Sequence, residues 1–458
     1  MAKKTKAADL SIEEKLEQAL IVSGYEPYKI PDNWCWTTLE YAAKWGSGGT
    51  PSRKVSDYYL GDIPWIKTGE LDNDFVYETE EHISEAAIRN SSAKLYPVNT
   101  VMIAMYGATI GKVGIMGVKA TTNQACANAV CGKNIYYKYL FYYAISQKDS
   151  FISKGKGGAQ PNISQEVIKK HEFPLPPLPE QQRIVERIES LFSKLDEAKE
   201  KAQEVINSFE TRKAAILHKA FSGELTAKWR EENGVGIESW ESTKIGNMLT
   251  EIKYGTSEKS DYSFDGIPVF RIPNIGDMTL IFDDVKKIQR QECSENEYLS
   301  EKDILIIRSN GSKELVGKCA LVPKINFKCT YASFLIRLRM KDSISSLYTV
   351  WYLTSEQARK QLFNKAKSSA GIHNINSKEI SDISIVVPSK PEQNIITATL
   401  ERLITKEKET VIFAESVIDQ IDAMKKSILS RAFRGELGTN DPEEESAVEL
   451  LKQILSGE

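Results

Sequence analysis

The stretch Ala220-Phe221-Ser222-Gly223-Glu224-Leu225 decides the fold of this chain, because it returns almost unchanged as Ala432-Phe433-Arg434-Gly435-Glu436-Leu437. A second motif precedes each copy, as Pro179-Glu180-Gln181 and as Pro391-Glu392-Gln393. The separation between the two copies is the same for both motifs. Insertions into loops cost little free energy, so this constant separation indicates that the length itself matters.

The segment between the two motifs has heptad spacing and contains no Pro or Gly in either copy. In the first copy, Arg212 is the one polar residue in a seam formed by Ile184, Ile188, Leu191, Leu195, Ala198, Ala202, Val205, Phe209 and Ile216. In the second copy, Glu407 and Thr410 interrupt a seam formed by Ile396, Leu400, Leu403, Ala414, Val417, Ile421, Met424 and Ile428. A narrow seam of this kind is typical of a coiled coil. We therefore predict two helices of roughly 38 residues, each about 55–60 Å long.

Pro179 and Pro391 stand where proline is favoured at the start of a helix, and Gly223 and Gly435 where glycine is favoured at its end. Only residues 224–239 lead from the end of the first helix into the following segment. A linker of that length cannot comfortably return the whole length of a helix, so we expect the two helices to be antiparallel. The alternative, in which each helix packs separately on its own module, is disfavoured because such a long helix outgrows one small domain.

The segments that precede the helices repeat more loosely. The run Asp62-Ile63-Pro64-Trp65-Ile66-Lys67 resembles Gly266-Ile267-Pro268-Val269-Phe270-Arg271. Short apolar runs at 101–104 and 304–307 are each followed by glycine-bounded turns, and Trp34 and Trp240 open the two copies. Such runs, bounded by Gly, Pro and Asn, predict strands joined by tight turns. We call these segments module one (25–176) and module two (236–388). Their shared frame and different loops suggest one task carried out on two targets.

The predicted fold class is α+β: two mixed α/β modules joined by two long antiparallel coiled-coil helices with pseudo-two-fold symmetry. The expected divisions are an N-terminal helical extension (1–24), module one (25–176), the first spacer helix (177–225), a linker with module two (226–388), the second spacer helix (389–437), and an acidic C-terminal segment with a helix (438–458). Ser11 and Glu14 form a capping box before the first of the terminal helices. These helices are too short to stand alone, so we expect them to dock on the spacer helices or to contact a partner protein.

Composition restricts the function. No apolar run approaches membrane-spanning length, and the basic start at 1–6 lacks a signal-type core, so we expect a cytoplasmic protein with no membrane partner. The six cysteines lack CxxC spacing and nearby histidines, so we expect them to be reduced and mostly buried, without a metal. A net charge of −3 is unusual for a nucleic-acid-binding protein, although acidic residues concentrate at both ends of the chain while basic residues lie in the modules.

No catalytic motif is complete. The segment 311–318 resembles a phosphate-binding loop, but its spacing is one residue too long and Cys319 replaces Ser or Thr. The sequence has no Asp/Asn-Pro-Pro-aromatic tetrad of amino-methyltransferases, no nuclease signature and no convincing cofactor-binding glycine loop. We therefore expect no catalysis and no cofactor in this chain.

The repeated helix motifs, the turn at 48–52, the strand Ile63-Pro64-Trp65 and the opening helix at 12–20 resemble the specificity subunit of type I restriction–modification systems. The resemblance covers nearly the whole chain. It implies that each module is a target-recognition domain for half of a split site on double-stranded DNA, and that the helices fix the gap. It also implies docking of two adenine-N6 methyltransferase subunits that bind S-adenosylmethionine. Such an assembly can recruit two restriction and translocation subunits that use ATP and Mg.

Base-reading groups are expected among polar loop residues that can make paired hydrogen bonds. The candidates in module one are Thr50, Ser52, Arg53, Lys67, Tyr106, Thr109, Asn123, Gln124, Gln160 and Asn162. The candidates in module two are Tyr254, Thr256, Arg271, Asn274, Arg308, Asn310, Lys313, Tyr331, His373 and Asn374. For each of them, capping of a turn is an equally good interpretation. Asn162 and Asn374 occupy equivalent positions, which suits the framework or phosphate contacts better than sequence discrimination.

Two other functions remain open. The chain could be a non-catalytic protein–protein scaffold, whose complexes would resist high salt, whereas phosphate-driven binding falls steeply with salt. It could also direct another kind of defence system to DNA.

Overall fold

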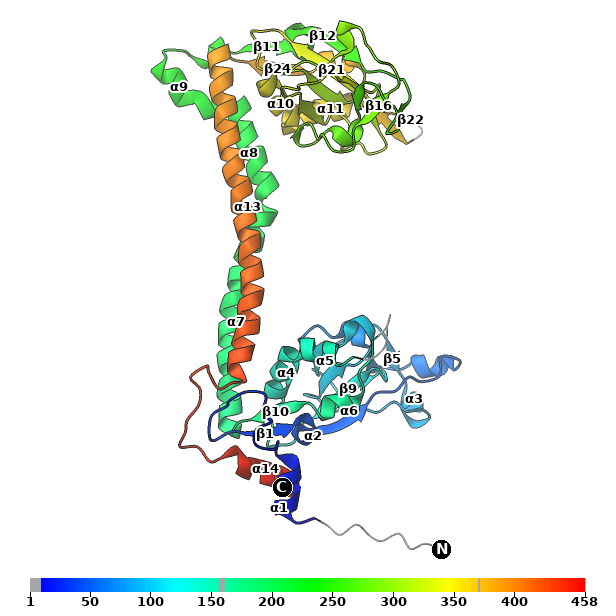
Figure 1. The fold of residues 1–458 in the computed structure, drawn as a ribbon, viewed down its shortest axis with the longest axis vertical. Coiled ribbons are helices and arrows are strands. Elements are labelled where there is room, and N and C mark those ends of the chain that lie inside the picture. Colours follow the sequence, from blue (N-terminus) through cyan, green and yellow to red (C-terminus); the bar gives the residue numbers. More distant parts are fainter. Residues whose placement is uncertain (1–9, 156–160, 370, 458) are drawn as a thin grey trace. The chain divides into compact units, whose positions relative to one another are not determined.

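The computed structural model describes residues 10–155, 161–369 and 371–457, which divide into two compact units. Unit 1 comprises Met1–Lys201 and Val417–Glu458, and unit 2 comprises Ala202–Ser416. Each unit holds one module together with segments of the long helices (Figure 1). The mixed α/β character of both modules confirms the predicted fold class.

Module one is built on a five-stranded sheet with the order β2-β9-β6-β7-β4. Its strands are β2 (Lys44–Ser47), β9 (Cys126–Val130), β6 (Val101–Ala104), β7 (Val113–Met116) and β4 (Phe75–Val76). A three-stranded sheet, β5-β3-β8, and a two-stranded sheet, β1-β10, complete it. These strands are β5 (His82–Ile83), β3 (Ile63–Ile66), β8 (Thr121–Thr122), β1 (Cys35–Thr38) and β10 (Glu172–Leu175). The helices are α2 (Leu39–Ala42), α3 (Glu85–Arg89), α4 (Tyr137–Ser146), α5 (Lys148–Ser153) and α6 (Gln165–Lys169).

Module two repeats this arrangement with a five-stranded sheet in the order β12-β21-β17-β19-β15. Its strands are β12 (Leu249–Tyr254), β21 (Leu335–Met340), β17 (Ile304–Ile307), β19 (Cys319–Leu321) and β15 (Met278–Thr279). Smaller sheets contain β13 (Ser260–Asp261), β16 (Lys286–Ile288), β14 (Pro268–Phe270), β20 (Thr330–Tyr331), β18 (Ser309–Asn310), β23 (Ile372–Asn374), β22 (Lys367–Ser369), β11 (Glu241–Lys244) and β24 (Ser384–Val387). The helices are α10 (Ser346–Thr354), α11 (Glu356–Lys365) and α12 (Ser377–Ser381), and α9 (Ala227–Glu232) lies in the linker before the module.

The central strand of each module is apolar throughout because both faces of its sheet are covered. In β6, Val101 and Ile103 join the core that includes α4, while Met102 and Ala104 join a second core on the opposite face. Alternate side chains of a strand point to opposite faces of the sheet, so a run without polar residues is expected where both faces are buried. The same division recurs in β17 of module two.

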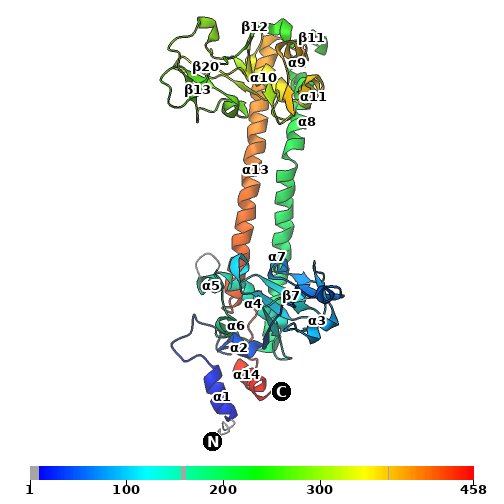
Figure 2. The same cartoon turned by 90° about the vertical axis from the view of Figure 1, so that its right-hand side faces the viewer.

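The long helical segments are α7 (Leu178–Asn207), α8 (Phe209–Phe221) and α13 (Lys390–Ala432). In unit 1, Asp196 pairs with Lys425 and Lys199 with Asp422, so α7 and α13 are antiparallel there. In unit 2, α8 lies beside the first half of α13 (Figure 2). The antiparallel prediction is therefore confirmed within each unit.

Ser208 separates α7 from α8 by a single residue, but the first spacer helix continues across it. Ser208 keeps right-handed helical backbone angles (φ −85°, ψ −1°), its N–H donates to the Glu204 carbonyl at 3.0 Å, and its carbonyl accepts the Arg212 N–H at 3.0 Å. The Ser208 hydroxyl also donates to the carbonyl of Glu204 at 2.6 Å, and the Arg212 guanidinium donates to the carbonyl of Val205 at 3.1 Å. Side-chain donors that bond to helix carbonyls in this way bend a helix locally.

Arg212 and Glu407, which each interrupt an apolar seam, contact each other in unit 2. The Arg212 Nε lies 2.6 Å from Glu407 Oε2, and both side chains are about one-third exposed. Glu407 was expected only to weaken its seam. That expectation is incomplete, because the charge of Glu407 is paired with that of Arg212, the polar residue in the other seam.

Replacing Arg212 alone by Leu should destabilise unit 2 by about 1 kcal/mol, since the pair is partly exposed and the Glu407 charge would then stand unmatched in the seam. The double change Arg212→Leu with Glu407→Leu should regain at least the wild-type stability, because it completes the apolar seam. Urea unfolding of the single and double variants checks this. A double variant less stable than either single variant would contradict it.

The glycines at the ends of the two helices have the predicted capping conformation. Gly223 has φ +88° and Gly435 has φ +73°. Residues that carry a side chain rarely adopt this left-handed backbone conformation, so glycine is favoured there. A Cβ at Gly435 would also lie 2.4 Å from Pro31.

The Glu and Gln side chains of the repeated Pro-Glu-Gln motif are buried and hydrogen-bonded, a role that was not predicted from the sequence. Glu180 is fully buried in unit 1, where its carboxylate accepts the Trp34 indole N–H at 2.7 Å and the Asn440 amide at 2.8 Å. Gln181 accepts the Tyr136 backbone N–H at 2.9 Å and donates to the carbonyl of Pro176 at 3.1 Å. The motif thus ties the start of α7 to module one and to the C-terminal segment.

The same motif in unit 2 has a charged partner. Glu392 is fully buried and accepts Arg230 at 2.7 Å, Thr226 at 2.6 Å and the Trp240 indole N–H at 3.0 Å. Gln393 again accepts a backbone N–H, that of Ser345, at 2.7 Å. The repeated tryptophans and glutamates of the sequence are therefore hydrogen-bonding partners.

The two ends of the chain meet in unit 1. Helices α1 (Ile12–Ala19) and α14 (Ala447–Ser456) lie side by side (Figure 1). Arg183 on α7 makes a two-point contact with Glu444 at 2.8 and 2.9 Å. The predicted capping box is present, with the Glu14 N–H donating to Ser11 Oγ at 3.2 Å. The acidic segment before α14 therefore contacts a spacer helix, while docking of the terminal helices themselves on it and contact with a partner protein stay predictions.

All six cysteines are free, and four of them are buried, as expected. Burial raises the pKa of Cys126 to about 12. In the part of the chain that the structure describes, no helix is long and apolar enough to cross a membrane.

Candidate nucleic-acid interface

Three of the predicted residues of module two meet at one end of its central sheet. The guanidinium of Arg308, which follows β17, lies 4.7 Å from the centre of the Tyr254 ring at the end of β12. The Arg308 Nε donates to Asn374 Oδ1 at 3.4 Å. The Tyr254 hydroxyl accepts the Ser377 N–H at 3.0 Å, and the Tyr254 ring remains 42 % exposed. This arrangement presents a positive, planar group beside an exposed aromatic ring.

Asn310 and His373 lie next to this group because β18 pairs with β23, which places Asn310 opposite His373 and Ser309 opposite Asn374. The Asn310 side chain accepts the Ser312 N–H at 2.8 Å, as in an Asx turn. Both Asn310 and His373 are half-buried. Lys313 is exposed on the same loop, with its ammonium 5.4 Å from the Phe363 ring.

Two other candidates of module two serve its fold. Asn274 is fully buried and closes a turn by accepting the Arg271 N–H at 2.8 Å. Tyr331 is also buried, and its hydroxyl lies 3.4 Å from the carbonyl of Lys253. Burial raises the pKa of Tyr331 to about 12. Side chains that are buried and internally bonded cannot reach a base edge, so we remove both from the proposed contact set.

Arg271 and Thr256 keep surface positions but have partners within the module. Arg271 lies 3.4 Å from Asp284 Oδ2 and donates to the Asp284 carbonyl at 2.9 Å. The Thr256 hydroxyl accepts the Glu258 N–H at 3.1 Å. Thr256 follows Gly255, where a Cβ would lie 2.2 Å from the carbonyl oxygen of Tyr331.

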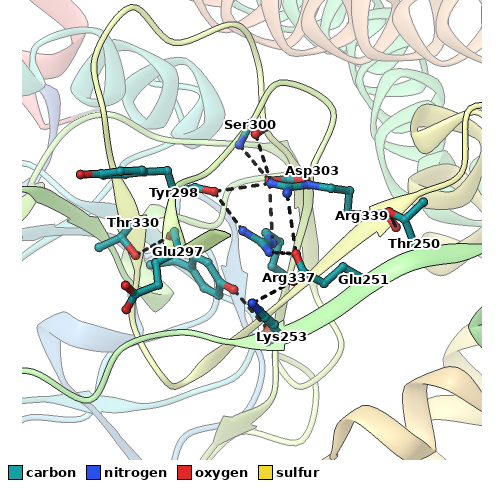
Figure 3. Close-up of polar contacts among 11 residues, drawn as sticks. Thr250, Glu251, Lys253, Glu297, Tyr298, Ser300, Asp303, Thr330, Arg337 and Arg339 are labelled. Carbon is teal, nitrogen blue, oxygen red and sulfur yellow. Dashed lines mark hydrogen bonds and ion pairs between the residues drawn. The ribbon is translucent and has the colours of Figure 1, made fainter. Parts of the chain in front are cut away.

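A buried charge network lies beneath this sheet (Figure 3). Arg337 is fully buried, pairs with Glu251 on β12, and donates to the carbonyl of Tyr298 at 2.9 Å. Arg339 makes two bonds of 2.8 Å to the buried Asp303. Burial acts to raise the pKa of Glu251, but the Lys253 hydrogen bond and both arginines outweigh it and lower that pKa. The network fixes the strand that ends in Tyr254.

Two neutral polar candidates of module one, Thr50 and Gln124, meet after β2 and β8. The Thr50 hydroxyl contacts the side chain of Gln124, and both residues are exposed. Ser52 is exposed on the same loop. Gly48, just before Thr50, has no room for a side chain, since a Cβ would lie 2.1 Å from the carbonyl oxygen of Asn123.

Arg53 and Lys67 both form ion pairs with one carboxylate. Arg53 lies 2.6 Å from Glu81, and Lys67 lies 3.1 Å from the same side chain and 3.0 Å from Glu80. The Arg53 guanidinium also lies 4.1 Å from the centre of the Tyr59 ring. These hydrogen bonds lower the pKa of Glu81, first of all the bond from Arg53.

The acidic partners Glu81 and Asp284 were missed in the sequence. Each stands shortly before the strand that pairs antiparallel with β3 or β14, and those strands lead into Lys67 and Arg271. The signal that could have found them is an acidic residue shortly before one strand of a pair, where the other strand of that pair is followed by a basic residue.

The remaining candidates of module one lie on turns. Tyr106 is 42 % exposed and forms an antiparallel bridge with Asn162, which is also exposed. Thr109 donates to the carbonyl of Tyr106 at 2.7 Å, and Asn123 accepts the Ala125 N–H at 3.2 Å. Both are turn-capping contacts. Gln160 lies outside the described residues.

His171 is a buried histidine near this face of module one. Its Nδ1 accepts Lys154 Nζ at 2.7 Å, and Gln147 Oε1 lies 3.1 Å from its Nε2. Burial first, and then the Lys154 charge, lower the pKa of His171 to about 4, while Glu172 acts in the opposite direction. The neutral ring is therefore the form that fits the fold.

Unit 1 should lose stability as the pH falls from about 6.5 to about 4, because the unfolded chain binds a proton at His171 that the folded form excludes. The contribution of this group is roughly 3 kcal/mol, since each pKa unit corresponds to about 1.4 kcal/mol. Thermal unfolding of wild type and His171→Gln across this range checks it. The two curves should converge toward pH 4 and separate above it, and a constant difference would contradict the account.

Among the described residues, no group of three or more His, Cys, Asp or Glu side chains is placed to hold a metal ion. The chemistry that the two faces offer is hydrogen bonding, positive charge and aromatic stacking. Those are the groups with which proteins contact base edges and phosphates.

Comparison with known proteins agrees with this chemistry. The family model described as the type I restriction modification DNA specificity domain matches twice, at residues 31–208 and 237–412. The type I restriction enzyme EcoKI specificity subunit of Escherichia coli K12 is 26 % identical over 451 residues, which cover 93 % of this chain and 96 % of that protein.

Two solved structures share the fold. One chain from a structure on complex assembly and conformational transition of the type I R-M system matches with a TM-score of 0.66 at 18 % identity, covering 90 % of this chain and 100 % of that chain. The HsdS subunit from Thermoanaerobacter tengcongensis matches with a TM-score of 0.62 at 19 % identity, covering 90 % of this chain and 99 % of that one. The two family matches span most of the sequence, and this chain belongs to the type I restriction–modification DNA specificity family.

Proposed function

We propose that this chain is the subunit that reads a bipartite, asymmetric DNA site and directs adenine-N6 methyltransferase subunits to it. The observation that carries the proposal is that two modules of one frame carry different side chains at equivalent places. Arg308 in module two occupies the position of Met105 in module one. The backbone carbonyl of Arg308 accepts the N–H of Ile375, and the backbone carbonyl of Met105 accepts the equivalent N–H of Ile163. One frame with different reading groups suits the recognition of two different half-sites.

The two half-sites should differ in sequence. A symmetric dimer reads a palindrome because its two recognition surfaces are identical, whereas these two modules differ. Module two offers Arg308, Asn310 and His373 along one strand pair. Module one offers Thr50, Gln124 and Tyr106 instead.

The chain supplies recognition and no catalysis in this proposal. Two methyltransferase subunits would bind S-adenosylmethionine, and restriction subunits, where the system has them, would use ATP and Mg. Residues 25–176 and 236–388 would act as the recognition domains, 177–225 and 389–437 as the spacer helices, and the assembly would work in the cytoplasm. The scaffold alternative is less favoured because the family match is to a DNA specificity domain.

Reconstitution with an adenine-N6 methyltransferase subunit from the source cell tests the proposal. Transfer of labelled methyl groups from S-adenosylmethionine to DNA should require both proteins, and neither alone should act. Binding of the complex to DNA should weaken steeply as salt rises, because phosphate contacts release counterions. Equal methylation without this chain, or binding that salt leaves unchanged, would contradict the proposal.

A further inference from the structure

We propose that Arg308 reads a guanine in the half-site of module two. The inference rests on the proposed function and goes beyond it, because it assigns one base to one side chain. An arginine that reaches the major groove can donate two parallel hydrogen bonds to O6 and N7 of guanine, which is the most frequent specific contact between proteins and DNA.

The structure holds Arg308 in place from two sides. Its guanidinium lies over the Tyr254 ring at 4.7 Å, and its Nε donates to Asn374 Oδ1 at 3.4 Å. Stacking fixes the plane of the guanidinium, and the Nε bond fixes its rotation. The two terminal nitrogens are the ones that a guanine would engage.

The groups that hold Arg308 are themselves held. The Tyr254 hydroxyl accepts the Ser377 N–H at 3.0 Å and lies 3.2 Å from the Ser377 hydroxyl. Asn374 lies in β23, where it is paired with Ser309 of β18. A side chain prepared in this way loses little conformational entropy when it binds.

Arg308 differs from the other predicted arginines in its charge partners. Arg53 is paired with Glu81, and Arg271 with Asp284. Within the described part of the chain, no carboxylate forms an ion pair with Arg308, and its contacts are an aromatic face and an amide oxygen. Its hydrogen-bonding capacity is therefore available to a ligand that carries acceptors.

Module one lacks this device at the equivalent place. The buried Met105 occupies the position of Arg308. The strand register places Ser47 at the position that Tyr254 has in module two. Asn162 occupies the position of Asn374, since it bridges Tyr106 as Asn374 pairs with Ser309. The asparagine is thus part of the shared frame and a positioning residue, while the arginine belongs to module two alone.

The first test uses the wild-type chain in complex with its methyltransferase, on duplexes in which each guanine of the module-two half-site is replaced in turn by 7-deazaguanine. This base lacks the N7 acceptor and keeps normal pairing. One replacement should weaken methylation at limiting DNA, but by less than the about 5- to 150-fold that loss of a whole two-point contact of about 1–3 kcal/mol would give, because the O6 acceptor remains. No loss at any guanine of that half-site would overturn the inference.

The second test combines the DNA change with Arg308→Ala and Arg308→Lys. If the contact is real, Arg308→Ala should methylate the normal and the 7-deazaguanine duplex equally well, and Arg308→Lys should retain part of the preference. The matched control is Lys328→Ala, which removes one positive charge from an exposed pair with Glu295 in the same unit and should keep the full wild-type preference.

The outcomes separate the two proposals. A wild-type complex that methylates no DNA at all contradicts the proposed function. A wild-type complex that methylates normally, while Arg308→Ala keeps the same sensitivity to 7-deazaguanine, overturns the assignment of Arg308 alone. Half-site one should be unaffected in every variant, because the changed residue lies in module two.

Discussion

Replacing Glu392 by Gln should destabilise unit 2 by about 3–5 kcal/mol, whereas the same change at Glu180 should cost unit 1 less than about 1 kcal/mol. The two glutamates belong to the same repeated motif, and both are fully buried. Their partners decide the difference. Glu392 neutralises Arg230, whose side chain is only 9 % exposed, while Glu180 accepts hydrogen bonds from the neutral groups of Trp34 and Asn440.

The physical reason is the cost of an uncompensated buried charge. With Gln at position 392, the Arg230 guanidinium would keep its contacts with Thr226 and the Gly223 carbonyl but lose its counter-charge. Burial, against the hydrogen bonds from Asn440 and Trp34, raises the pKa of Glu180. A neutral side chain at position 180 therefore relieves a desolvation cost that develops as the pH rises above the usual carboxyl pKa.

Urea unfolding followed by circular dichroism of the full chain measures both changes. The double variant Glu392→Gln with Arg230→Met is the control, since removing both charges should restore much of the stability lost in Glu392→Gln. For Glu180→Gln, the stability relative to wild type should improve as the pH rises from about 4 toward 7. Equal losses at the two positions would contradict the difference that the structure shows.

Replacing Arg337 by Ala should destabilise unit 2 by about 3–5 kcal/mol as well. The side chain is fully buried, so its loss leaves a cavity and also removes one of the positive partners of Glu251. Glu251 would then be held by Lys253 at 2.9 Å and by Arg339 at 3.7 Å. The double variant Arg337→Met with Glu251→Met should be more stable than Arg337→Ala, because it removes both charges and fills the space.

Thermal unfolding checks the stability, and a methylation assay checks the role. Arg337 supports β12 from within the module, so the preference among half-site bases should survive in whatever fraction remains folded. Lys328→Ala, at an exposed ion pair, is expected to change stability by less than about 0.5 kcal/mol. A change of base preference in Arg337→Ala below its unfolding temperature would show that the network does more than support the strand.

Much of the architecture followed from the sequence, because its strongest signals are local and repeated. The seam residues reflect the periodicity of a helix. The motif glycines and the apolar runs of β6 and β17 are local signals of a helix end and of a buried strand. The local irregularity at Ser208 did not follow, since it depends on side-chain bonds to carbonyls that neither Pro nor Gly marks. The pairing of Arg212 with Glu407 also depends on the register between two segments far apart in sequence.

The candidate site was harder to predict than the fold. Loop residues such as Arg308 and Tyr254 could be named from their chemistry, but their contact depends on the pairing of β17 with β21 and of β21 with β12. Asn274 has the same chemistry as a base-reading asparagine, yet it is buried as a turn cap. Residue type alone cannot separate these two uses, because both need an amide with a donor and an acceptor.

The central claim is that this chain selects a split DNA site for methylation. A genome-wide map of N6-methyladenine in the source cell, with the gene intact and with it deleted, tests that claim most directly. The account predicts that one motif with two unlike halves and a fixed gap loses its methylation on deletion and regains it when the gene is restored. An unchanged map from a strain in which the partner methyltransferase subunit is expressed would contradict it.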